Sequence, residues 1–213
     1  MTIAALFGTT LPLIQAPMAG VQDHGLAAAV CEAGGLGSLP CAMLSAEAMH
    51  RELTALRART SRPFNVNFFC HVPPRPDAAR EAAWRAALAP YYAELGLDIA
   101  AVPAGAGRTP FSAAFADALE DFKPAVVSFH FGLPAPELLA RVRGWGSKVV
   151  SSATTVAEAR WLEAQGVDAV IAQGLEAGGH RGMFLSDDIT TQSGSFALLR
   201  QVVRAVHVPV IAA

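Results

Sequence analysis

The chain has 213 residues, of which 53% are hydrophobic, and 16 basic against 18 acidic side chains give a formal charge of −2. This length suits one large domain with a real core, and the balanced charge excludes the basic footprint of a nucleic-acid-binding or membrane-surface protein. Three cysteines at unrelated spacings form neither a disulfide framework nor a zinc pattern, so we expect a reduced, cytoplasmic protein without a membrane segment.

Short apolar runs alternate with longer amphipathic runs along most of the chain. The apolar runs are nearly continuous, which is typical of strands covered on both faces of a parallel sheet. In chain order, we predict strands over 12–17, 36–40, 64–69, 125–131, 148–153, 168–173 and 208–213. Helices are predicted between them, over 24–34, 45–60, 78–96, 135–146, 155–166 and 194–206. Asp23 and Ser45 are the expected N-cap residues of the first two helices.

Repeated strand–helix units predict an α/β fold, either a doubly wound parallel sheet or a closed (β/α)8 barrel. From residue 125 onward the units recur without the long excursion that would mark a sheet reversing its direction. This regular spacing favours the TIM barrel. Such barrels have eight strands in about 250 residues, and the seventh predicted strand is the last in this sequence. We therefore expect a TIM (β/α)8 barrel that is truncated after its seventh strand.

The segment 70–124, between the third and fourth predicted strands, breaks this spacing. It contains a proline-rich turn, the predicted helix 78–96 and a glycine-rich loop at 104–110. A structureless loop of that length is uncommon inside a compact domain. We therefore predict a helical insertion over the barrel mouth, within a single domain that spans 1–213. An ordinary crossover helix with a longer connection is the alternative.

The most polar loop of the chain follows the sixth predicted strand and reads QGLEAGGHRG, residues 173–182. In TIM barrels the active site lies on loops at the carboxyl ends of the strands. His180 is the candidate proton acceptor, because an imidazole titrates near neutral pH; a surface histidine in a flexible loop is the alternative. Arg181 could hold an anion or remain a solvated loop charge.

Other candidates lie at the ends of other predicted strands. Asn67 and Gln173 carry amides that could bond the polar edge of a heterocycle or tie loops together. Met18 could pack against a planar ring or fill the core. His130 has apolar neighbours and is either a site residue or a satisfied core histidine. The scattered histidines and cysteines lack the spacing of metal ligands, so no metal site is predicted.

Five stretches in chain order resemble the nitronate monooxygenase family, formerly called 2-nitropropane dioxygenases, and its bacterial type most closely. They are PLIQAPMAG, GGLGSLP, NVNFFCHVPP, VVSFHFGLP and QGLEAGGHRG, and the resemblance runs from residue 11 to residue 213. It implies an FMN-bearing TIM barrel that oxidises alkyl nitronates with molecular oxygen. The implied partners are this small substrate and oxygen, and a second copy of the chain could cover the exposed sheet edges.

The resemblance also assigns roles to individual residues. His180 matches the family's base, and His130 lines the substrate side, where we also place Arg181. The implied flavin-ring contacts are Met18, Asn67, Gln173 and Gly178. The family's FMN phosphate lies in glycine-rich loops after strands seven and eight, so we expect this chain alone to bind FMN poorly.

Three alternatives stay open. FMN-dependent NAD(P)H:quinone reductases and enoyl-acyl-carrier-protein reductases share much of the pattern, but they consume a nicotinamide. A non-redox aldolase or isomerase would place a lysine or paired carboxylates at strand ends, whereas Lys148 begins a predicted strand. The third alternative is an inactive fragment that lacks the FMN phosphate site.

Overall fold

The computed structural model describes residues 2–101 and 108–213. These residues belong to two compact units, one made of Met1–His71 with Arg108–Ala213 and the other of Val72–Gly107. Of the predicted glycine-rich loop at 104–110, residues 104–107 lie outside the described residues. Within the described ranges, no helix combines the length and the apolar character that crossing a membrane requires.

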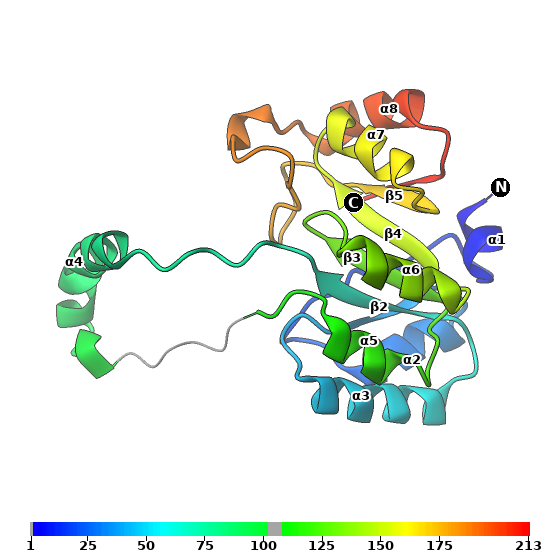
Figure 1. Ribbon diagram of the computed structural model, residues 1–213, viewed down its shortest axis with the longest axis horizontal. Helices are drawn as coiled ribbons and strands as arrows, with labels where there is room; N and C mark the ends of the chain where they lie inside the picture. Colours follow the sequence, from blue (N-terminus) through cyan, green and yellow to red (C-terminus); the bar gives the residue numbers. More distant parts are fainter. Residues whose placement is uncertain (1, 102–107) are drawn as a thin grey trace. The chain divides into compact units, whose positions relative to one another are not determined.

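The larger unit is built on a six-stranded parallel sheet in which each strand lies beside its predecessor (Figure 1). The strands are β1 (Gly37–Pro40), β2 (Phe64–Phe69), β3 (Val126–His130), β4 (Lys148–Ala153), β5 (Ala169–Ala172) and β6 (Val210–Ala212). A doubly wound sheet reverses its strand order at a switch point, whereas a barrel adds strands in sequence. The sequential order therefore confirms the α/β barrel architecture over the doubly wound alternative.

The predicted strand over 12–17 is wrong in its extent, because only a single bridge forms there, between Ile14 and Leu36. The amide of Leu36 donates to the Leu13 carbonyl, and the amide of Gln15 donates to the Leu36 carbonyl. The prolines at both ends of this segment have no amide proton to extend the ladder. The segment still lies beside β1 and begins the row of parallel elements.

Helices connect the strands and pack on the outer face of the sheet (Figure 1). They are α2 (His24–Glu32), α3 (Ala46–Arg59), α5 (Ala113–Leu119), α6 (Pro136–Gly144), α7 (Val156–Ala164) and α8 (Ser195–Ala205). The Asp23 side chain accepts from the Gly25 amide and that of Ser45 from the Ala48 amide, so both predicted N-caps are confirmed. Helix α5 was not predicted; it is the crossover between β2 and β3.

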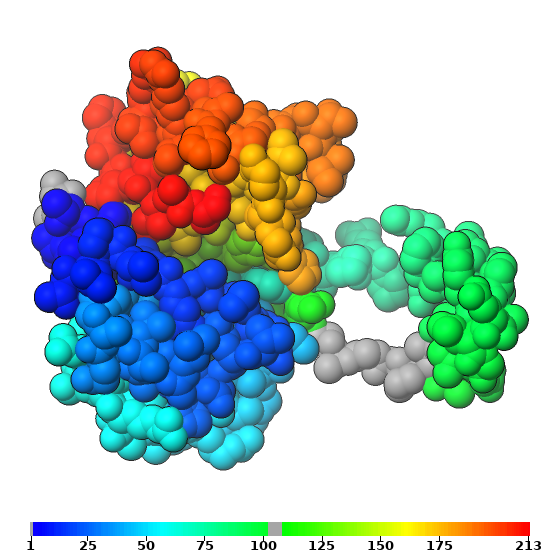
Figure 2. Space-filling model, turned by 180° about the vertical axis from the view of Figure 1, so that it is seen from behind, coloured from blue at the N-terminus to red at the C-terminus, as the bar shows by residue number. Residues whose placement is uncertain are grey.

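The inner face of the sheet is apolar at the amino-terminal ends of its strands. There Phe7, from a short unpredicted helix α1 (Ile3–Phe7), packs with Leu36, Val126 and Val150. Figure 2 shows the amino-terminal segment in blue next to the carboxyl-terminal residues in red, which agrees with the packing of Ile211 against the same cluster. Helix α1 thus covers this end, and the carboxyl-terminal end is left for polar residues.

The smaller unit contains α4 (Ala78–Glu94), which confirms the predicted helix 78–96, and a 3-10 turn, η1 (Ile99–Ala101). The Asp77 carboxylate caps α4 by accepting from the amides of Ala79 and Arg80. Within this unit Arg85 donates to the Ile99 carbonyl at 3.1 Å. The later part of the predicted insertion, residues 108–124, belongs to the larger unit. That the insertion covers the barrel mouth stays a prediction.

Candidate active site

A row of polar side chains occupies the inner face of the sheet toward the carboxyl ends of the strands. Side chains alternate between the two faces of a strand, and the register pairs Ser38 with Asn65 and Asn67 with Ser128. The members are Ser38, Asn65, Asn67, Ser128, His130, Ser152 and, directly after β5, Gln173. The three strand-end candidates in this row, Asn67, His130 and Gln173, therefore share one face and one end of the sheet.

Asn65 belongs to this row and was missed by the sequence analysis. Its Nδ2 lies 3.0 Å from the Ser38 hydroxyl and 2.9 Å from the Ser128 hydroxyl. The Nδ2 of Asn67 lies 3.0 Å from the same Ser128 hydroxyl. The buried Oδ1 of Asn65 has no hydrogen-bond partner among the described residues. The signal was available: in FNVNFF the two asparagines are two positions apart, and thus on one face of a strand.

His130 is tied down through both ring nitrogens. Its Nδ1 lies 3.0 Å from the Ser152 hydroxyl, and its Nε2 lies 3.0 Å from the backbone carbonyl oxygen of His180. A carbonyl can only accept, so Nε2 carries the proton and the Ser152 hydroxyl donates to Nδ1. Burial lowers the pKa of His130, because desolvation disfavours the charged imidazolium. A neutral, fully hydrogen-bonded His130 is therefore suited to holding structure rather than to transferring a proton.

The imidazole of His180 is differently placed. It is exposed, and its ring centroid lies 5.5 Å from that of Phe69 and 6.1 Å from that of Phe131. No hydrogen bond to its ring nitrogens occurs within the described ranges. His71, at the end of β2, completes this aromatic group with a centroid 6.1 Å from that of Phe131. His180 thus combines solvent access with uncommitted nitrogens. The half-buried His71 also has an unpartnered ring nitrogen, Nδ1, among the described residues.

The turn after β3 has a strained backbone. Phe131 has φ of 67° and Gly132 has φ of 87°, so two consecutive residues adopt the left-handed region. For a bulky residue such as Phe131 this costs on the order of 1–3 kcal/mol, and such strain is concentrated at functional sites. The Ser151 hydroxyl, 2.8 Å from the Gly132 carbonyl, holds the turn. The strain places the Phe131 ring 4.5 Å from the His130 ring, centroid to centroid.

Gln173 ties the loop that carries His180. Its Nε2 donates to the His180 carbonyl at 3.0 Å, and its Oε1 accepts from the Gly182 amide at 2.7 Å. The Gln173 amide therefore ties the loop together, which is one of the two roles predicted for it. Gly182 is required here, since a Cβ at this position would lie 2.6 Å from the Cε1 of His130. A Cβ at Gly178 would meet no atom within 4 Å, so that backbone is open to a ligand.

The remaining candidates lie at the edges of this arrangement. Arg181 donates through Nη1 to the Gly174 carbonyl at 3.4 Å, so its guanidinium lies against the backbone of its own loop. Glu176 accepts from the Ser195 amide at 2.9 Å, and backbone amides at Glu176 itself and at Ser195 lower the pKa of its carboxyl group. Met18 is half-exposed in the loop before α2. Neither Arg181 nor Met18 has a recorded contact with the His180 ring.

The polar atoms available at this end of the sheet fit the edge of a flavin ring better than they fit a metal ion. Asn67 is 7% exposed, and its Nδ2 is used by Ser128, which leaves Oδ1 as a neutral acceptor. The buried Oδ1 of Asn65 is a second unpartnered acceptor. In the described part of the chain, no three His, Cys, Asp or Glu side chains are grouped as metal ligands would be. Neutral amides and an open glycine backbone suit a planar heterocycle.

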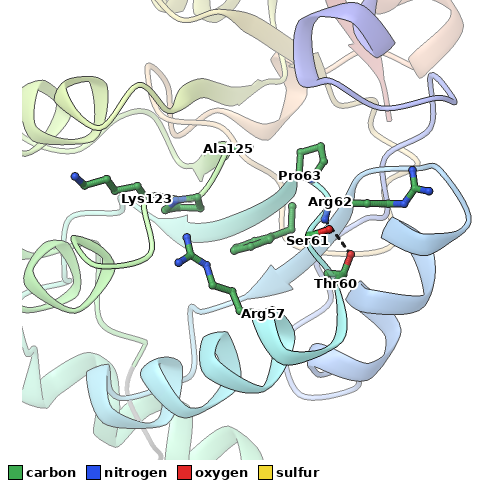
Figure 3. A pocket seen from close by; sticks show the side chains of 9 residues that line it. Arg57, Thr60, Ser61, Arg62, Pro63, Lys123 and Ala125 are labelled. Atoms are coloured by element: carbon green, nitrogen blue, oxygen red, sulfur yellow. Dashed lines mark hydrogen bonds between the residues drawn. The ribbon is translucent and has the colours of Figure 1, made fainter.

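A separate hollow of about 380 Å³ lies at the amino-terminal ends of β2 and β3 and is lined by cationic side chains (Figure 3). Arg57 donates to the Phe122 carbonyl and its guanidinium lies 5.3 Å from the centre of that residue's ring. Arg62 lies 3.7 Å from the Glu32 carboxylate. Arg57 and Arg62 thus have partners within the protein, and the hollow is at the end of the barrel opposite to the usual active site. We do not assign the active site to it.

Comparison with known proteins shows the family to which the chain belongs. The model of the family described as nitronate monooxygenase matches residues 2–213. A nitronate monooxygenase from Paraburkholderia phytofirmans is 45% identical over 98% of this chain and 57% of its own length. The structure of a nitroalkane oxidase from Streptomyces ansochromogenes is 43% identical with a TM-score of 0.83, over 99% of this chain and 59% of that one. FabK from Thermotoga maritima is 26% identical with a TM-score of 0.69, over 98% and 52%. The chain spans little more than half the length of these relatives.

Proposed function

The chain belongs to the nitronate monooxygenase family, and from this premise we propose that the protein oxidises alkyl nitronates with molecular oxygen, using FMN. The observation that best supports the proposal is the contrast between the two histidines. His130 is neutral and engaged at both nitrogens, whereas the His180 imidazole is exposed between two aromatic rings. One imidazole of the pair is thus available for substrate.

FMN, when bound, supplies the electron transfer from the substrate to oxygen. We propose that Asn67, Met18 and Gly178 hold its ring. The free Oδ1 of Asn67 would accept from a ring N–H, the half-exposed thioether of Met18 would pack on the ring face, and the open backbone at Gly178 permits close approach. Gln173 acts on the same site by keeping the His180 loop in place.

His180 is the proposed proton acceptor for a neutral nitroalkane. Its imidazole would take the proton from the carbon next to the nitro group and would donate a hydrogen bond to a substrate that arrives as the nitronate anion. The rings of Phe69 and Phe131 contact it edge to face. Arg181, the next residue, adds positive charge on the side where an anionic nitronate would bind.

Oxygen uptake at a saturating concentration of FMN, which offsets the weak FMN binding expected of this chain, tests this function. We expect uptake on addition of a nitronate such as that of 2-nitropropane, without any nicotinamide. The similarity to FabK makes an NAD(P)H-dependent reductase the second candidate. Oxidation of NAD(P)H with a quinone or an enoyl thioester, together with no oxygen uptake on nitronate, would overturn the proposal in favour of that candidate.

A further inference from the structure

Glu158 is a buried carboxylate that the proposed chemistry does not use. It lies in the first turn of α7 and is 1% exposed. Its Oε2 accepts from the Thr154 amide at 2.7 Å and the Thr154 hydroxyl at 2.8 Å. Its Oε1 accepts from the amides of Phe184 at 2.7 Å and Leu185 at 3.2 Å. All of these partners donate, so both carboxylate oxygens act as acceptors.

The local sequence accounts for only part of this arrangement. Thr155 is the N-cap of α7 and accepts from the Glu158 amide at 3.2 Å, which is the first half of a capping box. In such a box the glutamate returns to the amide of the N-cap residue. Here it reaches past the helix end to Thr154 and to the loop after β5. Half of its acceptor capacity is thus used on a segment that is remote in sequence.

The loop that receives these bonds has no helix or strand between residues 173 and 188. Side chains therefore replace regular backbone pairing in fixing it. Gln173 binds the backbone at His180 and Gly182, and Glu158 binds it again at Phe184 and Leu185. The backbone is thus held at His180 itself and again at Gly182, Phe184 and Leu185.

The same contact extends to the loop after β3. The ring of Phe184 packs against Trp161 of α7 with centroids 5.2 Å apart. It also lies against Gly132, where a Cβ would approach the ring to 3.2 Å. Gly132 directly follows the strained Phe131, whose ring faces His180. An anchored Phe184 backbone therefore supports both the loop that carries His180 and the turn that follows His130.

From this geometry we propose that Glu158 is a positioning residue that holds the His180 loop in its reactive arrangement. The proposal rests on the function proposed above. It acts through backbone hydrogen bonds and not through contact with substrate. Because a 1 Å displacement of a reacting group can cost about a hundredfold in rate, the loss of this anchor is expected to affect catalysis well beyond its effect on folding.

Glu158→Gln keeps one acceptor oxygen, which can face the loop amides while its NH2 group donates to the Thr154 hydroxyl, so it is the conservative control. Glu158→Ala removes both acceptor oxygens and is the sharpest test. We expect the amides of Phe184 and Leu185 to exchange with deuterium about tenfold faster in this variant. Exchange in β4 and β5 should be unchanged. This readout requires neither substrate nor turnover.

Activity provides the second readout. In the FMN-loaded Glu158→Ala variant we expect kcat/KM to fall roughly 10- to 100-fold for a neutral nitroalkane, and clearly less for the corresponding preformed nitronate, which needs no deprotonation. Leu162→Val is the control for stability. Leu162 is fully buried on the same helix and makes none of the hydrogen bonds that hold the loop, so its truncation is expected to lower stability without changing the ratio of the two activities.

The outcomes separate the two proposals. Faster exchange with a lowered ratio of neutral to nitronate activity supports the positioning role. Unchanged exchange at Phe184 and Leu185, or an unchanged ratio despite faster exchange, would overturn it. A wild-type protein that binds FMN but takes up no oxygen with either substrate would overturn the proposed function, while the exchange result would still decide whether Glu158 anchors the loop.

Discussion

The Nε2 of His130 lies 3.0 Å from the backbone carbonyl oxygen of His180, and this contact joins the end of β3 to the loop that follows β5. Because the carbonyl accepts, the contact fixes the tautomer of His130 and turns its Nδ1 toward Ser152. The two histidines of the candidate site therefore have different roles. His130 holds the backbone of His180, and His180 keeps its own imidazole available for substrate.

The fit of Gly182 against His130 makes a stability prediction. Gly182→Ala places a Cβ 2.6 Å from Cε1 and 2.9 Å from Nδ1 of His130, so the imidazole must move and lose its hydrogen bonds. We expect the free energy of unfolding to fall by about 1–3 kcal/mol, measured by denaturant titration. Gly178→Ala is the matched control, since no atom lies within 4 Å of its Cβ. Equal effects of the two substitutions would contradict the contact.

The Ser128 hydroxyl makes a second stability prediction. It is buried and lies within 3.0 Å of the side-chain amides of both Asn65 and Asn67. Ser128→Ala leaves buried N–H groups with fewer partners, which costs about 1–3 kcal/mol in the free energy of unfolding. The exposed Ser61 makes no side-chain hydrogen bond within the described part of the chain, so Ser61→Ala should change stability little. A neutral Ser128→Ala substitution would show that water replaces the hydroxyl.

Burial of His130 predicts a pH dependence of stability. Its folded-state pKa is lowered from the model-compound value of 6.5, so the unfolded chain takes up a proton first as the pH falls. The stabilising effect of a neutral His130 is therefore complete above about pH 6.5 and is lost as the pH falls toward the folded-state pKa. We expect the free energy of unfolding to decrease as the pH falls below about 6.5, and to decrease less in His130→Asn. Parallel pH profiles for both proteins would refute this.

Much of the fold follows from local pattern. Continuous apolar runs bounded by capped helices located β1 to β6, and their even spacing indicated the barrel. The short helices α1 and α5 escaped prediction, because they are stabilised by tertiary packing of Phe7 and Phe115 rather than by a long amphipathic repeat. The strand at 12–17 was overestimated because apolar character was given more weight than the missing amide protons of its prolines.

The site was predictable as a location but not as an arrangement. Parallel strands bring their carboxyl ends to one edge, so Asn67, His130 and Gln173 could be grouped from sequence. That His130 binds the backbone of His180, 50 positions away, depends on the conformation of an irregular loop. The left-handed backbone of Phe131 was equally hidden, because no local rule favours it in a bulky residue.

Oxygen uptake by FMN-loaded wild type and His180→Ala, with a neutral nitroalkane and with its preformed nitronate, tests the central claim most directly. Because general-base catalysis contributes roughly 10²- to 10⁴-fold, we predict a loss of that size in kcat/KM for the nitroalkane and a distinctly smaller loss for the nitronate, with FMN content unchanged. Equal activity of variant and wild type on the neutral nitroalkane would contradict the assignment of His180 as the base.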